Sequence, residues 1–90
     1  MNVATGLSSG SSAPVQIRGG MYNIQVSGDF GGSTVAVEYG TDGANWYSET
    51  DSTFASPGAV NMELPGSGFY FLRGTVSGGS EVSIDIKAIG

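Results

Sequence analysis

The sequence predicts an all-β protein, a single antiparallel β-sandwich of six to eight strands with jelly-roll-like or immunoglobulin-like packing. Short runs of the chain alternate apolar and polar residues, which is the period of a strand with one buried face. The chain has 16 glycines in 90 residues, and they separate these runs at turn positions. No stretch shows a helical period. A chain of this length holds one domain.

The first 13 residues are expected to form a flexible N-terminal arm, residues 1–13, outside a β-sandwich domain of residues 14–90. The arm is rich in Ser and Gly and has too few apolar side chains to offset the entropy of ordering it. One interpretation is a frayed terminus. The other is an arm that orders against a neighbouring subunit, with Val3 and Leu7 as its apolar anchors.

Strand and turn signals then follow one another along the chain. Gly19-Gly20 interrupts a period-two pattern that begins at Val15, the Gly-rich segment 28–32 is expected to turn the chain, and Pro65–Gly68 is expected to end a strand. Asp42-Gly43 predicts a tight hairpin because Gly tolerates positive φ. Ser77–Ser80 closes a two-glycine hairpin, and a looser crossing segment covers 51–58. The expected strands are 15–18, 22–27, 34–39, 46–50, 60–64, 69–72 and 82–88.

The inward positions of these strands predict the core. We expect a lone Trp in such a fold to be a core anchor. The predicted core residues are Ile17, Tyr22, Ile24, Val26, Val35, Val37, Trp46, Val60, Met62, Leu64, Leu72, Val76, Val82, Ile84 and Ile86.

One strand breaks the alternation. In Phe69-Tyr70-Phe71-Leu72 both faces are apolar, so one pair of side chains lies outside the core. Exposed Phe is an aggregation liability that a closed oligomer would hide. We therefore expect Phe69 and Phe71, with Arg73 on the same face, at an oligomer or capsid interface. The alternative is that the segment Asp51–Gly58, with Phe54, covers this face within one chain.

Composition excludes several classes of function. The chain has no His and no Cys, which removes the usual general base, nucleophile and metal ligands. Its four aspartates, at positions 29, 42, 51 and 85, are scattered singly without calcium-loop spacing, so neither a metal nor a cofactor is expected. Three cations and a net charge of −5 argue against binding to nucleic acid or to an anionic membrane. No enzyme activity is expected.

Two weaker hypotheses concern the segment around Trp46. Asp42, Glu49 and Asp51 lie close to it in sequence, and paired carboxylates are what glycoside hydrolysis needs. The alternative is that Asp42 is a turn residue and the other two keep the surface soluble. Trp46 and Tyr47 could also form an exposed platform for a carbohydrate or another ligand.

Four runs of the chain carry motifs that matter together: Val26–Tyr39, Thr41–Trp46, Leu64–Gly66 and Leu72–Gly79. The chain resembles the small Gly-rich β-sandwich virion proteins of tailed bacteriophages, which include capsid decoration (cement) proteins and head-fibre-like proteins. The resemblance covers about Gly20 to Gly90. It departs from the pattern at Phe69–Leu72, where the similar proteins have a single Tyr before Arg73.

The resemblance implies a structural protein of the virion. It would bind the major capsid protein on the capsid surface and stabilise the head, and the three-fold positions of an icosahedral shell favour a homotrimer. The segment Met1–Pro14 lacks the basic start and apolar stretch of a secretion signal, so synthesis in the host cytoplasm is expected. The alternative is a small carbohydrate- or receptor-binding β-sandwich module of a phage fibre or tail.

Overall fold

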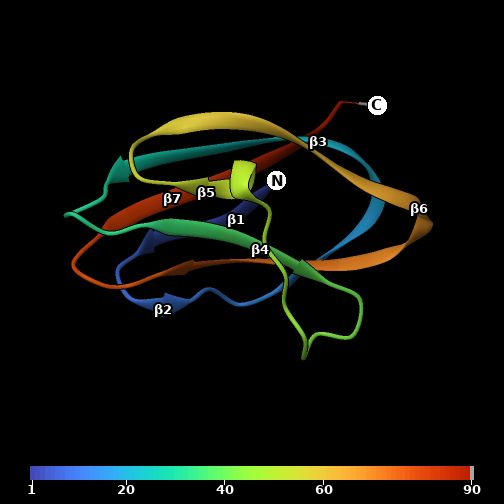
Figure 1. The fold of residues 1–90 in the computed structure, drawn as a ribbon, viewed down its shortest axis with the longest axis horizontal. Coiled ribbons are helices and arrows are strands. Elements are labelled where there is room, and N and C mark those ends of the chain that lie inside the picture. Colours follow the sequence, from blue (N-terminus) through green and yellow to red (C-terminus); the bar gives the residue numbers. More distant parts are fainter. Residues whose placement is uncertain (90) are drawn as a thin grey trace.

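A computed structural model describes residues 1–89, which form strands joined by short connections and one 3₁₀ helix (Figure 1). The elements are β1 (Asn2–Leu7), β2 (Gly10–Ser11), β3 (Val15–Asp29), β4 (Val35–Gly40), the 3₁₀ helix η1 (Thr50–Ser52), β5 (Thr53–Phe54), β6 (Gly58–Val76) and β7 (Glu81–Ala88).

The two longest strands, β3 and β6, run through both layers of a β-sandwich. Residues 20–26 of β3 pair with 58–64 of β6, and β7 and β1 continue this layer beyond β3. Residues 15–18 of β3 pair with 69–72 of β6, and β4 and β5 continue the second layer beyond β6. All of these pairs are antiparallel. The predicted all-β sandwich is therefore confirmed.

Gly19-Gly20 and Pro65–Gly68 are bends inside these long strands, so Pro65–Gly68 does not end a strand as expected. The register between β3 and β6 shifts between Arg18 and Gly20, and the chain continues as strand on both sides. A Cβ atom on Gly19 would lie 2.3 Å from the carbonyl oxygen of Gly66, so the bend brings the two backbones too close for a side chain. Gly19-Gly20 and Pro65–Gly68 thus pass the β3–β6 ribbon from one layer to the other.

The core lies between the two layers and follows most of the predicted alternation. Twelve of the predicted residues are buried, and Tyr22 and Val60 are partly buried and pack against them. The prediction that Trp46 is a core anchor is wrong, because Trp46 is half-buried and lies outside the core cluster. The core also contains Val3, Ala4, Phe30 and Phe54, which the alternation did not predict.

The N-terminal segment is part of the sandwich, which corrects the expectation of a separate arm at residues 1–13. β1 pairs with β7, with Ala4 opposite Ile84, and the Ile86 N–H donates to the Met1 carbonyl over 2.8 Å. Val3 and Ala4 are each 7% exposed. The physical reason is that β1 satisfies an edge of β7 that would otherwise be unpaired, while it buries two apolar side chains.

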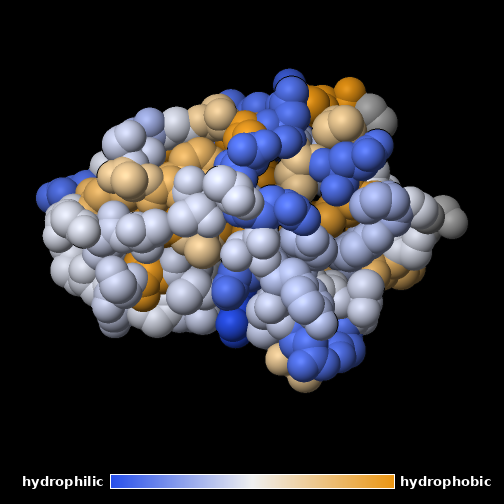
Figure 2. Space-filling model, in the orientation of Figure 1, coloured by the Kyte–Doolittle hydropathy of each residue, from blue (hydrophilic) through white to orange (hydrophobic). Residues whose placement is uncertain are grey.

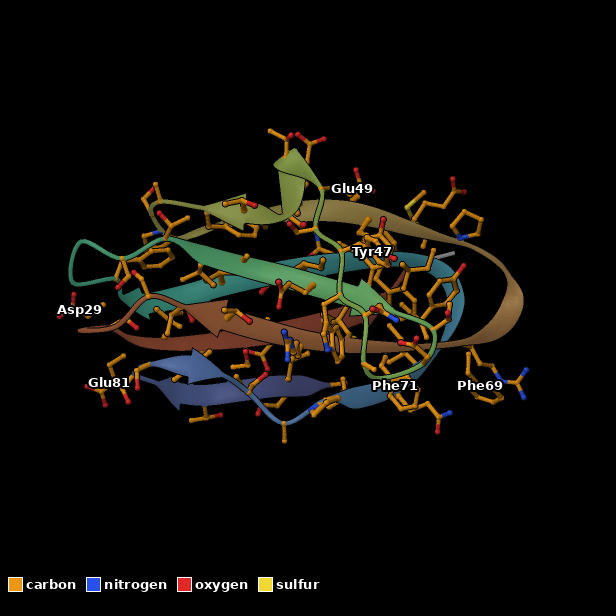
Figure 3. The ribbon with its side chains drawn as sticks, turned by 60° about the horizontal axis from the view of Figure 1, so that its bottom comes forward. Asp29, Tyr47, Glu49, Phe69, Phe71 and Glu81 are labelled. Atoms are coloured by element: carbon orange, nitrogen blue, oxygen red, sulfur yellow. The ribbon has the colours of Figure 1, made fainter. Side chains whose placement is uncertain are left out.

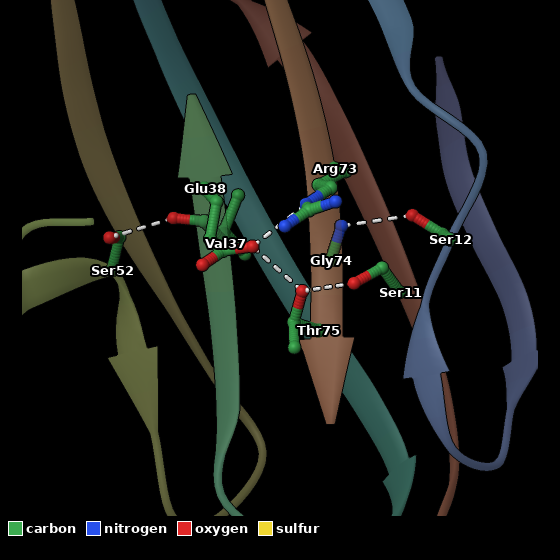
Figure 4. A network of polar contacts seen from close by, with 8 residues as sticks. All are labelled: Ser11, Ser12, Val37, Glu38, Ser52, Arg73, Gly74 and Thr75. Carbon is green, nitrogen blue, oxygen red and sulfur yellow. Dashed lines mark hydrogen bonds and ion pairs between the residues drawn. The ribbon is translucent and has the colours of Figure 1, made fainter. Parts of the chain in front are cut away.

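The expected strand 46–50 is also wrong. Tyr47 makes an isolated bridge to Tyr39, with N–H···O distances of 2.9 Å in both directions, and the chain then enters η1. Ser52 anchors this segment, because its hydroxyl is buried and donates to the Val37 carbonyl over 3.0 Å (Figure 4). A buried hydroxyl therefore replaces the strand ladder here. Within residues 1–89, no helix has the length and apolar character to cross a membrane.

Candidate functional site

The outward side of the second half of β6 carries most of the residues that the sequence singled out. Leu72, Gly74 and Val76 are buried, so Phe69, Phe71, Arg73 and Thr75 alternate with them on the opposite side. We call this side, with Glu38 of the neighbouring β4, the outer face. Figure 3 shows Phe71 and Phe69 on it, with Phe69 at the end of the sandwich opposite to Asp29 and Glu81.

Arg73 is the centre of a polar network on the outer face (Figure 4). Its Nε donates to Oε1 of Glu38 over 2.8 Å, and the Thr75 hydroxyl donates to the same oxygen over 2.7 Å. The Arg73 guanidinium also lies 4.3 Å from the centroid of the Trp46 ring, which is a cation–π contact. The charge of Arg73 is therefore compensated within the chain, and one side of the Trp46 ring is covered.

The loop that leads to Trp46 covers the middle of the outer face. A Cβ atom on Gly43 would lie 3.9 Å from the Phe71 ring, so this loop packs on Phe71. The Asp42 carboxylate holds the loop by accepting from the Ala44 and Asn45 N–H groups, each over 2.9 Å. These hydrogen bonds lower the pKa of Asp42 to about 2. Asp42 is a turn residue, as its alternative interpretation held.

The alternative prediction, that the segment Asp51–Gly58 with Phe54 covers the outer face, is wrong. Phe54 is 9% exposed and lies in the core, and its strand β5 pairs with β4. It does not cover Phe71. The cover comes from the Thr41–Trp46 segment, which reaches the outer face because the hairpin after β4 folds back over it.

Phe69 lies beyond this cover. It is 52% exposed, and the Arg18 guanidinium lies 5.0 Å from its ring centroid, since the two residues are paired across β3 and β6. The other predicted interface residues are less accessible: Val3 is buried, and Leu7 is partly buried against the core. Phe69 is therefore the predicted interface residue that a partner can reach.

Tyr47, the other half of the predicted ligand platform, is 61% exposed and lies against Tyr39. Its ring is tilted at 44° to Tyr39, with 6.4 Å between centroids. The Tyr39 hydroxyl donates to Oε1 of Glu49 over 2.7 Å, and this hydrogen bond to a carboxylate raises the pKa of Tyr39. The structure thus pairs Tyr47 with Tyr39 rather than with Trp46.

A groove opens beside Glu49, between η1 and the first half of β6. We call it the acidic groove, and its volume is about 220 Å³. Figure 2 shows strongly hydrophilic residues gathered around this part of the surface, while much of the remaining face is only weakly polar. The lining residues are Glu49, Asp51, Ser52, Val60, Asn61, Met62 and Glu63.

A second and larger groove lies beside Phe69. We call it the Arg18 groove, and its volume is about 480 Å³. Sequence reasoning missed it, because its walls come from chain segments far apart in sequence. The Gly19-Gly20 pair was the available signal, since the bend separates Tyr22 from the other β3 residues of the groove, Gln16, Ile17 and Arg18. The lining residues are Met1, Gln16, Ile17, Arg18, Tyr22, Phe69, Ile86, Lys87 and Ala88.

The arrangement can bind by stacking, apolar contact and charge. The three carboxylates near Trp46 in sequence have different roles. Asp42 holds a turn, while Glu49 and Asp51 line the acidic groove. Across residues 1–89, no three His, Cys, Asp or Glu side chains gather closely enough to hold a metal ion.

Comparisons with known proteins add little. No protein-family model matches the sequence, and no curated protein matches it. Among solved structures, the chain is similar to a carbohydrate-binding module, CBM6cm-2 from Cellvibrio mixtus lichenase 5A in complex with cellotriose. The two are 16% identical, with a TM-score of 0.43, and the match covers 93% of this chain and 75% of that chain.

Proposed function

We propose that this protein is a non-catalytic structural component of a tailed-bacteriophage particle, a decoration protein that binds the major capsid protein and stabilises the head. The observation that carries the proposal is Phe69, a large aromatic side chain that is 52% exposed beside an open groove. Exposed aromatic side chains next to a concave apolar surface are typical of protein–protein contacts. The resemblance of the turn motifs to those of phage virion proteins supports a phage shell as the partner.

The structure of the outer face changes the argument for a homotrimer. The loop Thr41–Trp46 of the same chain packs on Phe71 and Arg73, so these two residues need no neighbouring subunit to cover them. A trimer remains part of the proposal, with Phe69 as its remaining support. Light scattering at micromolar concentration measures the oligomeric state, and a monomer there would contradict a stable trimer.

A second candidate function is carbohydrate or receptor binding, and one observation favours it. Tyr47 is 61% exposed and contacts Tyr39, whose hydroxyl bonds Glu49 on the rim of the acidic groove. An exposed aromatic ring beside carboxylate and amide groups suits stacking against a sugar and hydrogen bonding to its hydroxyls.

One experiment separates the two candidates. Purified heads of a phage that encodes this chain, prepared without it, are mixed with the wild-type protein, Phe69→Ser and Tyr47→Ser, and bound protein is measured by co-sedimentation. We expect the wild type and Tyr47→Ser to sediment with the heads, and Phe69→Ser to remain in the supernatant. The two variants are matched, because each removes one exposed aromatic ring from the same fold.

The same proteins are then tested on immobilised host polysaccharide. The carbohydrate-binding role would replace the decoration role if the wild type binds the polysaccharide, Tyr47→Ser does not, and the wild type does not bind heads. Circular dichroism of all three proteins checks that neither substitution changes the β-sheet content.

A further inference from the structure

The Arg18 groove runs beside an edge of the sandwich that has no strand partner. Residues 15–18 of β3 pair with β6 on one side, and within residues 1–89 no strand pairs with their other side. Across the groove stand Ile86, Lys87 and Ala88 of β7, with Met1 held beside them by the Ile86 N–H. An unpaired strand edge next to a groove is the geometry in which an extended peptide adds to a sheet.

The charge of this groove is opposite to that of the chain. Arg18 and Lys87 are two of the three cations in a protein of net charge −5, and the third, Arg73, is paired with Glu38. No carboxylate belongs to the lining formed by residues 1–89, whereas the acidic groove has Glu49, Asp51 and Glu63 in its lining. Two exposed cations in one groove favour an occupant with carboxylates.

Most of the remaining lining is apolar, and two of its large side chains are accessible. Met1 is 65% exposed and Phe69 is 52% exposed, and these are two of the large apolar side chains that the surface leaves in contact with solvent. Tyr22 adds a second aromatic ring, fixed by the bond from its hydroxyl to the Arg18 carbonyl over 2.5 Å. An occupant would therefore bury aliphatic or aromatic side chains between its carboxylates.

We propose that the Arg18 groove binds an extended segment of another protein in which acidic and apolar residues alternate. This deepens the proposed function, on which it rests, by naming the chemistry that a shell protein would present. A second copy of this chain is a poor occupant. Its longest connection between strands, residues 41–52 in the described chain, packs on its own outer face through Gly43 and Trp46 and ends in η1.

The test uses a defined peptide, acetyl-LEVDLEV-amide, and a matched basic peptide, acetyl-LKVKLKV-amide. Each is titrated into ¹⁵N-labelled wild-type protein, and binding is followed through the backbone amide signals. We expect the acidic peptide to shift the amides of Gln16–Arg18 and Ile86–Ala88 and to leave those of Asn61–Glu63 unchanged. Raising the ionic strength weakens this binding, because exposed charges are screened by salt.

The variant Arg18→Gln/Lys87→Gln removes both cations of the groove and should weaken the acidic peptide about tenfold, which corresponds to ~1.4 kcal/mol. Its control is Thr34→Glu/Ser77→Glu, which makes the same change in net charge at exposed positions away from the groove. The control should bind as the wild type does. A general effect of net charge would weaken both variants equally and overturn the proposal.

Three further outcomes would overturn the proposal. The first two are that the acidic peptide does not bind and that the basic peptide binds equally well. The third is that, without any peptide, the signals of the same amides shift as the protein concentration rises. The last would mean that a second copy occupies the groove. Co-sedimentation with phage heads keeps the two proposals apart. If the protein binds heads but not the acidic peptide, the groove assignment alone is contradicted. If it binds the acidic peptide but not heads, the decoration role alone is contradicted.

Discussion

The two halves of β6 belong to one strand but present different outward sides. In residues 58–64, Met62 and Leu64 point into the core, while Asn61 and Glu63 are exposed, and Asn23 donates to the Asn61 side chain over 3.0 Å. In residues 69–76 the inward side is equally apolar, but the outward side carries aromatic rings and Arg73.

The difference follows from what lies outside each half. The outward side of the first half meets solvent, so polar residues suffice there. Over the second half, the Thr41–Trp46 segment forms a partial third layer that packs on Phe71 and on Arg73. In this protein, a strand with apolar residues on both sides indicates that the sheet is covered on both sides. Phe69 lies past the covering loop, so its apolar side chain stays exposed to solvent.

The largest expected effect comes from a substitution on the inward side of the second half of β6. Leu72 is 1% exposed, so Leu72→Ala removes buried methyl groups and leaves a cavity, which should lower the free energy of unfolding by about 2–5 kcal/mol. Phe69→Ala is the control, because it truncates a larger side chain on the outward side of the same strand. It should cost less than about 1 kcal/mol, the scale of an exposed cation–π contact. Urea denaturation measures both, and equal losses would contradict the assignment of the two sides.

A smaller effect tests how closely the layers approach at Gly74. A Cβ atom there would lie 2.2 Å from Cδ1 of Ile84, which is fully buried. Gly74→Ala should therefore destabilise the fold by about 1–3 kcal/mol, as overpacked cores do. Ile84→Val removes the opposing methyl group, so Gly74→Ala should cost much less in that background. Additive losses in a double-mutant cycle would show that the two groups do not meet.

The sequence predicted what depends on alternation and missed what depends on distant neighbours. The inward positions of β3, β4, β6 and β7 were found, because a period of two fixes the side to which each residue points. The pairing of β1 with β7 was missed, since a Gly- and Ser-rich segment shows no reason to be a strand until an unpaired edge is available to it. The Arg18 groove was missed for a related reason: its walls meet only after the ribbon bends at Gly19-Gly20.

Trp46 illustrates the limit at a single residue. A lone Trp in a β-sandwich suggests a core anchor, but this one stacks on Arg73 outside the core. Its position depends on the loop that Asp42 holds, and on the ion pair between Arg73 and Glu38, with a distance of 2.8 Å between Nε and Oε1. Neither contact could be read from the local sequence around Trp46.

The smallest expected effect concerns the cover of the second half of β6, and it depends on pH. Three hydrogen bonds from Ala44 and Asn45 lower the pKa of Asp42 to about 2, from an ordinary value of 3.8. A lowered carboxyl pKa gives stability that is fully present above the ordinary value and is lost as the pH falls through the folded-state value. Between about pH 4 and pH 2, the loop should therefore loosen and Trp46 should become more accessible. Its fluorescence should shift to the red and become more sensitive to iodide. In Asp42→Asn this change should be absent, because position 42 no longer titrates. A Trp46 transition that persists in Asp42→Asn would mean that another group holds the cover, and that the loop is not the element that separates the two halves of β6.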